Sequence, residues 1–368
     1  MAGRDPDFVL LVDSPDLGLP QALRGIAPLF QPFRPARWGE VEFRPPGDDR
    51  ATTGTIILAG PSDSGIAARC EARARRARQR GSALIVLGGA LAGREALAKR
   101  LFAATGLPVL AGVALETAAM IEACLVLLRW RGIDPGRAGA IVLVDPEHPT
   151  LGEAVVEYLS GLIGSVAVWG LERLRRRVLE KRVLESTGAA LETPKSLRHG
   201  LETADLVVSA SRHRDSGAFP RFPVSGAGPS ELHRPIVTAA LPPLGWARRD
   251  GEAETPVLLR LSGLSAALPA GDYPLRVLRV YFARPPGWCG RGEPGLPGGT
   301  LSAQLAEAVI MIRLGRRRVL RRHLSGEVLA RMREAALELG FRPHALAAIA
   351  GRMDRDRAAA AARGGELS

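Results

Sequence analysis

The sequence predicts an α/β protein with a Rossmann-like parallel sheet domain, an N-terminal α/β domain and closing C-terminal helices. Three buried apolar runs carry this prediction: AIVLV at 140–144, SVAVW at 165–169 and LVVSA at 206–210. Amphipathic segments with a helical period separate them, beginning with residues 151–162. Short apolar runs that alternate with helical segments are typical of parallel strands joined by crossover helices.

The first 115 residues show the same alternation, which predicts an N-terminal α/β domain over residues 1–115. Its expected strands lie at 8–12, 55–59, 83–87 and 108–110, and its expected helices at 65–80 and 94–105. Residues 39–50 are rich in proline, glycine and charge, so we expect a loop or ribbon there.

A long apolar helix is predicted at 117–131, where Gly132 and Pro135 end it. We expect this helix to pack between the first domain and a Rossmann-like domain over 116–282. Further strands of the second domain are expected at 182–185, 236–241, 257–261 and 276–282.

The remaining residues, 283–353, are predicted to pack back onto the two domains. They open with a loop rich in proline and glycine at 283–299. Helices are expected at 300–314 and 325–340, and a flexible tail at 354–368.

The composition limits the classes of function. A formal net charge of +12 fits an acidic partner, such as nucleic acid, an anionic membrane surface or an acidic carrier protein. The basic residues are nearly all arginine, with lysine only at Lys99, Lys181 and Lys195, so a bias of the whole composition explains the charge as well. Aromatic residues make up only 5% of the chain, which disfavours stacking on single-stranded nucleic acid.

Cysteine usage and the N-terminus predict a cytoplasmic protein. Cys70, Cys124 and Cys289 form no CxxC pair and no metal-binding spacing, so we expect reduced thiols and no metal site. The N-terminal MAGRDPDF lacks the basic and apolar parts of a signal peptide. The apolar stretch 109–130 carries Glu116 and Glu122, so no membrane span is expected.

The turn after residues 140–144 is the informative departure from a dinucleotide-binding unit. In such a unit the pyrophosphate is bound by main-chain N–H groups at the turn and at the start of the following helix. Here the turn reads DPEHPT at 145–150, and Pro146 and Pro149 supply no N–H. Thr150 and Glu153 have the spacing of a capping box, through which the helix would satisfy its own first N–H groups.

Two further groups of residues suggest catalytic chemistry. Cys289 lies near arginines that would lower a thiol pKa, which makes it the candidate for a nucleophile; the alternative is an incidental loop cysteine. Ser211, His213 and Asp215 are the residue types of a catalytic triad, but residues two apart in one loop seldom reach triad geometry. Arg212 and its neighbours in that loop would instead hold an anion.

The order of these pieces resembles the long-chain acyl-[acyl carrier protein] reductases and the related predicted amino acid dehydrogenases. The resemblance covers roughly residues 70–345 and rests on four stretches. They are ARRARQRGSALIVLGGAL at 74–91, GLPVLAGVALETAAMIEACLVLLRWRGIDPGRAGAIVLV at 106–144, ETADLVVSAS at 202–211 and LSAQLAEAVIMI at 301–312. A last helix ending in LGFRPH at 339–344 follows them.

The resemblance implies an N-terminal substrate domain and a Rossmann domain that binds NADP or NAD. It implies cofactor contacts at these positions: Thr150, Leu151, Gly152, Glu172 and Ser209. Glu172 follows Gly152 by about the separation of a ribose-binding acid. The alternative for Glu172 is a surface ion pair with Arg176 one helical turn on.

The functional motifs of the family are degenerate here. Pro146 and Pro149 occupy the first two glycine positions of the Gly-x-x-Gly-x-x-Gly loop, and this argues against an NADP or NAD cofactor. Gln304 takes the place of the catalytic cysteine, and the stretch ending at Pro243 lacks the family's tyrosine and lysine. Of the polar stretch before the long helix only Gly112 is kept.

Three functional hypotheses follow from the sequence. The first is a degenerate NAD(P)-dependent reductase that has a binding or regulatory role and no catalysis. The second is an active NAD(P)H-dependent oxidoreductase of the acyl-thioester or aldehyde type with a remodelled phosphate loop. The third is a basic binder of an acidic carrier protein or nucleic acid through the arginine runs at 69–80 and 316–322. A second copy of the chain, in a homo-oligomer, is an alternative partner.

Overall fold

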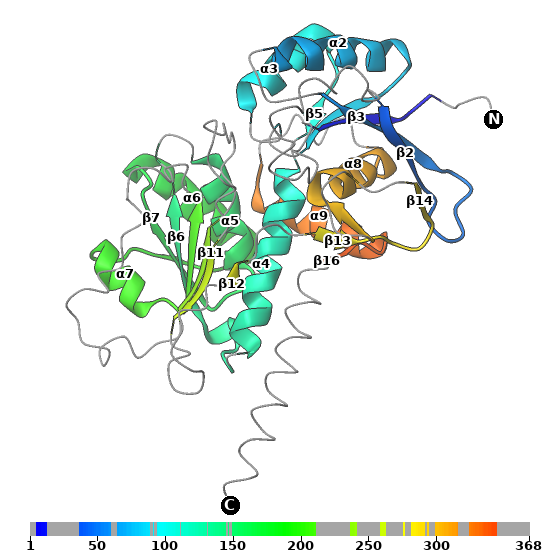
Figure 1. Cartoon of the computed structure of the whole chain (residues 1–368). Coiled ribbons are helices and arrows are strands. Elements are labelled where there is room, and N and C mark those ends of the chain that lie inside the picture. The colour runs from blue at the N-terminus through cyan, green and yellow to red at the C-terminus, as the bar shows by residue number, and fades with distance from the viewer. Residues whose placement is uncertain are drawn as a thin grey trace, which may run out of the picture.

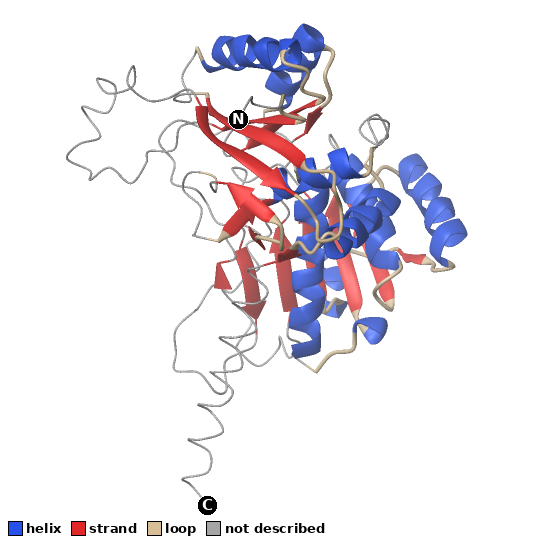
Figure 2. Ribbon diagram, turned by 90° about the vertical axis from the view of Figure 1, so that its right-hand side faces the viewer, coloured by secondary structure: helices blue, strands red, loops and turns tan. Residues whose placement is uncertain are grey.

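A computed structural model gives the fold of the chain (Figure 1). The structure describes residues 5–12, 37–59, 65–88, 91, 94–110, 112–130, 132–144, 146, 149–210, 236–240, 258–262, 275–276, 281–290, 293, 299–315 and 324–343. Two α/β units are present, each built around its own sheet, which confirms the predicted α/β fold class. Figure 2 shows the two sheets and the helices that cover them.

The first unit is a six-stranded sheet whose central strands are parallel. In spatial order its strands are β14 (Trp288–Gly290), β2 (Arg37–Phe43), β3 (Thr52–Leu58), β1 (Phe8–Val12), β4 (Leu84–Gly88) and β5 (Val109–Leu110). Only β2 and β14 run antiparallel to their neighbours. Along β1 the side chains alternate, because Val9 and Leu11 pack under α2 (Ile66–Gln79) and α3 (Glu95–Thr105) while Phe8 and Leu10 join the other core.

The second unit is a seven-stranded sheet. In spatial order its strands are β12 (Leu275–Arg276), β11 (Leu258–Ser262), β10 (Ile236–Ala240), β9 (Leu206–Ala210), β6 (Gly139–Val144), β7 (Ser165–Trp169) and β8 (Leu191–Glu192). The five strands from β10 to β8 are parallel, and β11 and β12 are antiparallel. Its helices are α5 (Thr150–Ser160), α6 (Arg173–Thr187) and α7 (Leu197–Thr203), and a 3-10 turn at Pro135–Arg137 precedes β6.

Helices from distant parts of the chain join the two units. The helix α4 (Val113–Trp130) leaves the first sheet after β5 and runs beside the second, where it contacts β10 (Figure 1). From the C-terminal part, α8 (Ala303–Arg313) packs on β4, β1 and β3, and α9 (Gly326–Glu338) packs on both α4 and α5. A small antiparallel sheet of β15 (Thr300–Ser302), β13 (Tyr281–Ala283) and β16 (Arg342–Pro343) supports them. Among the described helices none is long and apolar enough to cross a membrane.

Three predicted elements differ from the structure. Residues 182–185 were predicted as a strand but belong to α6, because only Leu179 and Val183 of that helix are buried and the apolar stripe is too narrow to show its period. Residues 39–50 contain much of β2, whose alternating residues Val41 and Phe43 are buried. The predicted loop at 283–299 contains β14, which adds an antiparallel edge strand to the first sheet.

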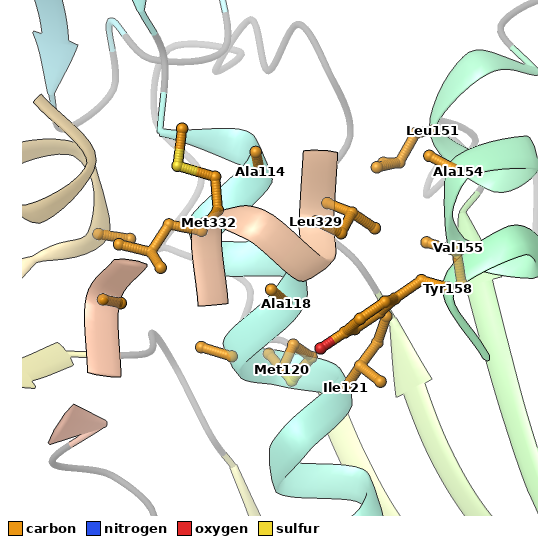
Figure 3. Packing of buried hydrophobic residues seen from close by; sticks show 14 of the residues in the cluster. Ala114, Ala118, Met120, Ile121, Leu151, Ala154, Val155, Tyr158, Leu329 and Met332 are labelled. Atoms are coloured by element: carbon orange, nitrogen blue, oxygen red, sulfur yellow. The ribbon is translucent and has the colours of Figure 1, made fainter. Parts of the chain in front are cut away.

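The core between α4, α5 and α9 holds a tyrosine whose hydroxyl has no hydrogen-bond partner among the described residues. Tyr158 is 7% exposed, and its ring extends from α5 toward Met120 and Ile121 of α4 (Figure 3). Burial raises the pKa of its hydroxyl to about 12. The ring therefore contributes packing energy, while the hydroxyl is desolvated without compensation.

We expect Tyr158→Phe to leave the free energy of unfolding unchanged or to raise it by up to about 1 kcal/mol, since it removes an unsatisfied hydroxyl. Tyr158→Ala, which also removes the ring, should lower it by about 3–5 kcal/mol. Urea unfolding of the two variants beside the unchanged protein measures both effects. A loss of more than about 1 kcal/mol in the phenylalanine variant would mean that the hydroxyl is paired after all.

Candidate functional site

The carboxyl end of β6 is the point where the order of strands in the second sheet reverses. The chain continues from β6 through α5 to β7 on one side, and β9 later returns to pair with β6 on the other side. Ligands of open α/β sheets bind outside the carboxyl ends of the strands at such a switch point. The predicted contacts Thr150, Leu151 and Gly152 begin α5 at this place.

Gly152 holds the start of α5 tightly against β6. An added Cβ at Gly152 would lie 2.6 Å from Cγ1 of Val144, the last residue of β6, so only glycine allows this close approach. Such a glycine serves helix-to-strand packing at the head of a Rossmann unit. The first turn of α5 is thereby fixed at the strand end.

The predicted capping box does not form. Pro149, which is buried, occupies the position before α5, and no side chain among the described residues caps the helix. The Glu153 carboxylate turns to α6, where it accepts hydrogen bonds from Arg175 at 3.1 Å and Arg182 at 2.9 Å. Two arginines of a neighbouring helix outweigh the local cap, because both partners of these hydrogen bonds are ionised, whereas the main-chain N–H of a cap is neutral. The first N–H groups of α5 are therefore not satisfied by Glu153.

Gly170 brings a second turn to the same edge. It follows β7 with a φ of +95°, and an added Cβ would lie 2.2 Å from the carbonyl oxygen of Val144. Only glycine fits at this position for both reasons. Sequence analysis missed Gly170, although a glycine directly after an apolar run is the usual signal for such a close approach.

The remaining predicted residues are not brought together at this edge. Glu172 precedes α6 and is exposed; the alternative pairing with Arg176 is wrong, because Arg176 pairs with Glu180 at 3.2 Å. Cys289 is exposed on β14, at the far edge of the first sheet. The backbone of Ser209 lies in β9, and its side chain is not among those that the structure describes.

Several other predicted residues lie outside the part of the chain that the structure describes. They are Ser211, Arg212, His213, Asp215, Pro243 and the run 316–322, and residues 145, 147 and 148 of the turn after β6 lie outside it as well. Pro146 is described and exposed. Within the described residues no cluster of histidine, cysteine and acidic side chains has the arrangement of a metal site.

Sequence analysis also missed a buried carboxylate between α4 and α8. Glu307 is 4% exposed and accepts a hydrogen bond at 2.9 Å from the N–H of Leu115, in the first turn of α4. The pKa of Glu307 is raised to about 7. Burial is the main cause and the charge of the neighbouring Glu116 acts in the same direction, while the N–H groups of Leu115 and Ala114 act in the opposite direction. Glu307, in the middle of α8, therefore caps the N-terminal end of α4. The signal in the sequence is a single charge within the apolar run AQLAEAVIMIR.

Gln304 lies at the same junction. Its Nε2 donates to Oε2 of Glu116 at 3.4 Å, and its Cα lies 2.6 Å from where a Cβ on Gly112 would be. The resemblance placed Gln304 at the position of a catalytic cysteine. In the structure it is a packing and hydrogen-bonding residue where α8 meets the start of α4.

No family model and no curated protein matches the chain. Among solved structures, it is similar to the ornithine carbamoyltransferase from Pyrococcus furiosus, with 11% identity, a TM-score of 0.33 and coverage of 68% of this chain and 75% of that chain. The catalytic subunit of aspartate transcarbamoylase from M. Jannaschii gives 12% identity, a TM-score of 0.31 and coverage of 67% and 75%.

The ornithine carbamoyltransferase from Campylobacter jejuni gives 9% identity, a TM-score of 0.29 and coverage of 56% and 61%. The chain thus spans less than two thirds of the length of this neighbour. At these TM-scores the likeness carries no assignment of activity to the chain.

The predicted resemblance to acyl-[acyl carrier protein] reductases and amino acid dehydrogenases is wrong. The neighbours that recur are ornithine and aspartate carbamoyltransferases, a different group of α/β proteins. The hypotheses of a degenerate reductase and of an active NAD(P)H-dependent oxidoreductase rested on that resemblance and are withdrawn with it. The hypothesis of a basic binder of carrier protein or nucleic acid also finds no support in these neighbours.

Proposed function

We propose that the protein binds a small anionic molecule, one with a phosphate or carboxylate group, at the carboxyl end of β6. The observation that carries the proposal is the reversal of strand order at β6, between β7 and β9. At such a reversal the connections leave to opposite faces of the sheet and expose main-chain groups between them.

The local geometry favours an anion. The first turn of α5 lies at the reversal, and the N-terminus of a helix carries partial positive charge and N–H groups that point outward. Pro149 offers no side-chain acceptor to these groups, and the Glu153 carboxylate is occupied by arginines of α6. Gly152 and Gly170 both lie directly against Val144, where neither position has room for a Cβ atom.

A change of charge at Thr150 tests the proposal. Thr150→Asp places a carboxylate in the first turn of α5, where it should repel a bound anion and compete for the same N–H groups. Asparagine matches aspartate in size and hydrogen-bonding reach but carries no charge, so Thr150→Asn is the matched control. We expect the aspartate variant to bind about tenfold more weakly than the asparagine variant.

The measurement is calorimetric titration with inorganic phosphate, pyrophosphate and citrate, together with the melting temperature in each. A ligand that binds only the folded state raises the melting temperature. Saturable binding that Thr150→Asp weakens and Thr150→Asn preserves supports the proposal. The proposal is wrong if none of the three anions binds, or if the two variants bind them equally.

A further inference from the structure

The large apolar side chains that remain exposed in the described part of the chain gather on α6. Leu174 is 72% exposed, Val178 59% and Leu184 57%, and Trp169, which is 38% exposed, ends the strand just before this helix. Elsewhere in the described residues only Phe102 and Leu314 belong to this class, each on a different element. Exposed apolar side chains gathered on one helix mark an interaction surface.

These side chains point away from the protein core. Successive residues of a helix are rotated by about 100°, and the buried Leu179 and Val183 define the inner side of α6. The opposite side, which we name the α6 outer face, carries Arg173, Leu174, Arg177, Val178, Lys181, Leu184 and Glu185. All seven are exposed. Figure 1 shows α6 on the second unit, where α5 is its main contact.

The α6 outer face has a surplus of positive charge. Arg173 and Arg177 form no ion pair with any described residue, and Lys181 pairs with Glu185 at 3.7 Å. The arginines nearer the inner side are neutralised within the protein, since Arg175 and Arg182 bind Glu153 and Arg182 also binds Glu157. The free basic groups of α6 are therefore directed outward together with its apolar side chains.

The mixture of charge and apolar groups decides the partner. The central part of a protein–protein interface is depleted in charge, whereas here basic residues alternate with leucine and valine. A second copy docking through the same face would bring arginine against arginine. An anionic lipid surface suits both components, because aliphatic side chains enter the boundary of the acyl chains while guanidinium and ammonium groups reach the phosphates.

We propose that the α6 outer face binds anionic lipid headgroups and places the second unit against a membrane surface. The helix lies in the plane of the headgroups with Leu174, Val178 and Leu184 toward the acyl chains. Arg173 and Arg177 bind lipid phosphates. Binding is reversible and weakens with added salt, because each basic residue near such a surface contributes an electrostatic attraction that ions screen.

Vesicle sedimentation of the full chain tests this proposal. The probes are vesicles of phosphatidylglycerol mixed with phosphatidylcholine, and vesicles of phosphatidylcholine alone, at low and high salt. One variant removes apolar groups, Leu174→Ser with Val178→Ser, and another removes charge, Arg173→Gln with Arg177→Gln. Matched controls on other elements are Phe102→Ser, which removes an exposed apolar side chain, and Arg44→Gln, which removes an exposed charge.

We expect sedimentation with the phosphatidylglycerol vesicles only, about tenfold weaker in either α6 variant and unchanged in the controls. Absence of sedimentation, or sedimentation that both α6 variants retain, overturns the proposal. Self-association in analytical ultracentrifugation that the Leu174→Ser, Val178→Ser variant abolishes would assign the face to a second copy. If free polyglutamate competes with the vesicles as strongly as free lipid vesicles do, the α6 outer face would be assigned to an acidic polypeptide.

Discussion

Gly112→Ala should lower the free energy of unfolding by about 3 kcal/mol more than Gly132→Ala. The two glycines flank α4 and have nearly the same backbone conformation, with φ of +73° and +76°. Alanine therefore costs about 1–2 kcal/mol at both positions, through left-handed strain alone. At Gly132 an added Cβ meets no atom of the described residues within 4 Å, whereas at Gly112 it would lie 2.6 Å from Cα and 2.8 Å from N of Gln304.

The additional cost at Gly112 has a specific structural cause. The atoms that an added Cβ would meet include backbone of α8, which cannot move aside without shifting the whole helix. A shift that separates α8 from α4 lengthens the hydrogen bond from Leu115 to Glu307, and leaves a buried donor and a buried carboxyl unsatisfied. Each such group costs about 1–3 kcal/mol.

Urea unfolding followed by circular dichroism measures both glycine variants under the same conditions. The difference between the two midpoint urea concentrations, multiplied by a common m-value, gives the free-energy cost of the contact with α8. The backbone strain cancels because it is the same in both variants. Equal destabilisation of the two variants would mean that α4 and α8 do not depend on this contact.

Glu307→Gln should remove a dependence of stability on pH that the unchanged protein shows between about pH 4.5 and pH 7. The pKa of Glu307 is raised in the folded protein from 4.5 to about 7, chiefly by burial. Below pH 4.5 both the folded and the unfolded chain hold this proton. Between the two values only the folded chain holds it, so stability falls as the pH rises, and the loss is complete above about pH 7.

The size of this loss follows from the shift in pKa. One pKa unit corresponds to about 1.4 kcal/mol, so the contribution lost across the window is roughly 3 kcal/mol. Glutamine keeps a carbonyl oxygen for the N–H of Leu115 but cannot ionise. The glutamine variant should therefore match the unchanged protein in acid and exceed it in stability at about pH 8.

Two further variants separate the roles of the carboxyl group. Glu307→Ala removes the acceptor, so it should destabilise at every pH. Glu116→Gln removes the neighbouring carboxylate and should lower the pKa of Glu307. The pH range over which stability falls then becomes narrower. Urea unfolding across the pH range measures all of these. A glutamine variant with the same decline of stability between pH 4.5 and pH 7 as the unchanged protein would disprove the assignment.

The central strands of both sheets and most helices were predictable because the signals for them are local. The apolar runs at 8–12, 140–144 and 165–169 coincide with β1, most of β6 and β7. A strand buried on both faces must be apolar throughout, so its composition alone reveals it. The C-terminal helices were expected at 300–314 and 325–340, and their N-terminal caps Ser302 and Ser325 are local as well.

The polar contacts of the candidate site were not predictable in the same way. Glu153 has the spacing of a local cap, yet it binds arginines 22 and 29 residues further along the chain. The sequence shows which side chains are able to form hydrogen bonds, but the choice among partners depends on which helices meet. The family resemblance failed for a related reason, since the order of strands and helices is shared by many unrelated α/β proteins.

The sequence by itself determined the alternation of strands and helices and the two α/β units. Those features depend on the periodicity of neighbouring residues. Only the tertiary structure decided that Glu307 caps α4 across a separation of 192 residues, that β14 completes the first sheet, and that the apolar side chains of α6 face outward. These depend on packing between distant segments, because burial and the partner of a charge are properties of the assembled fold.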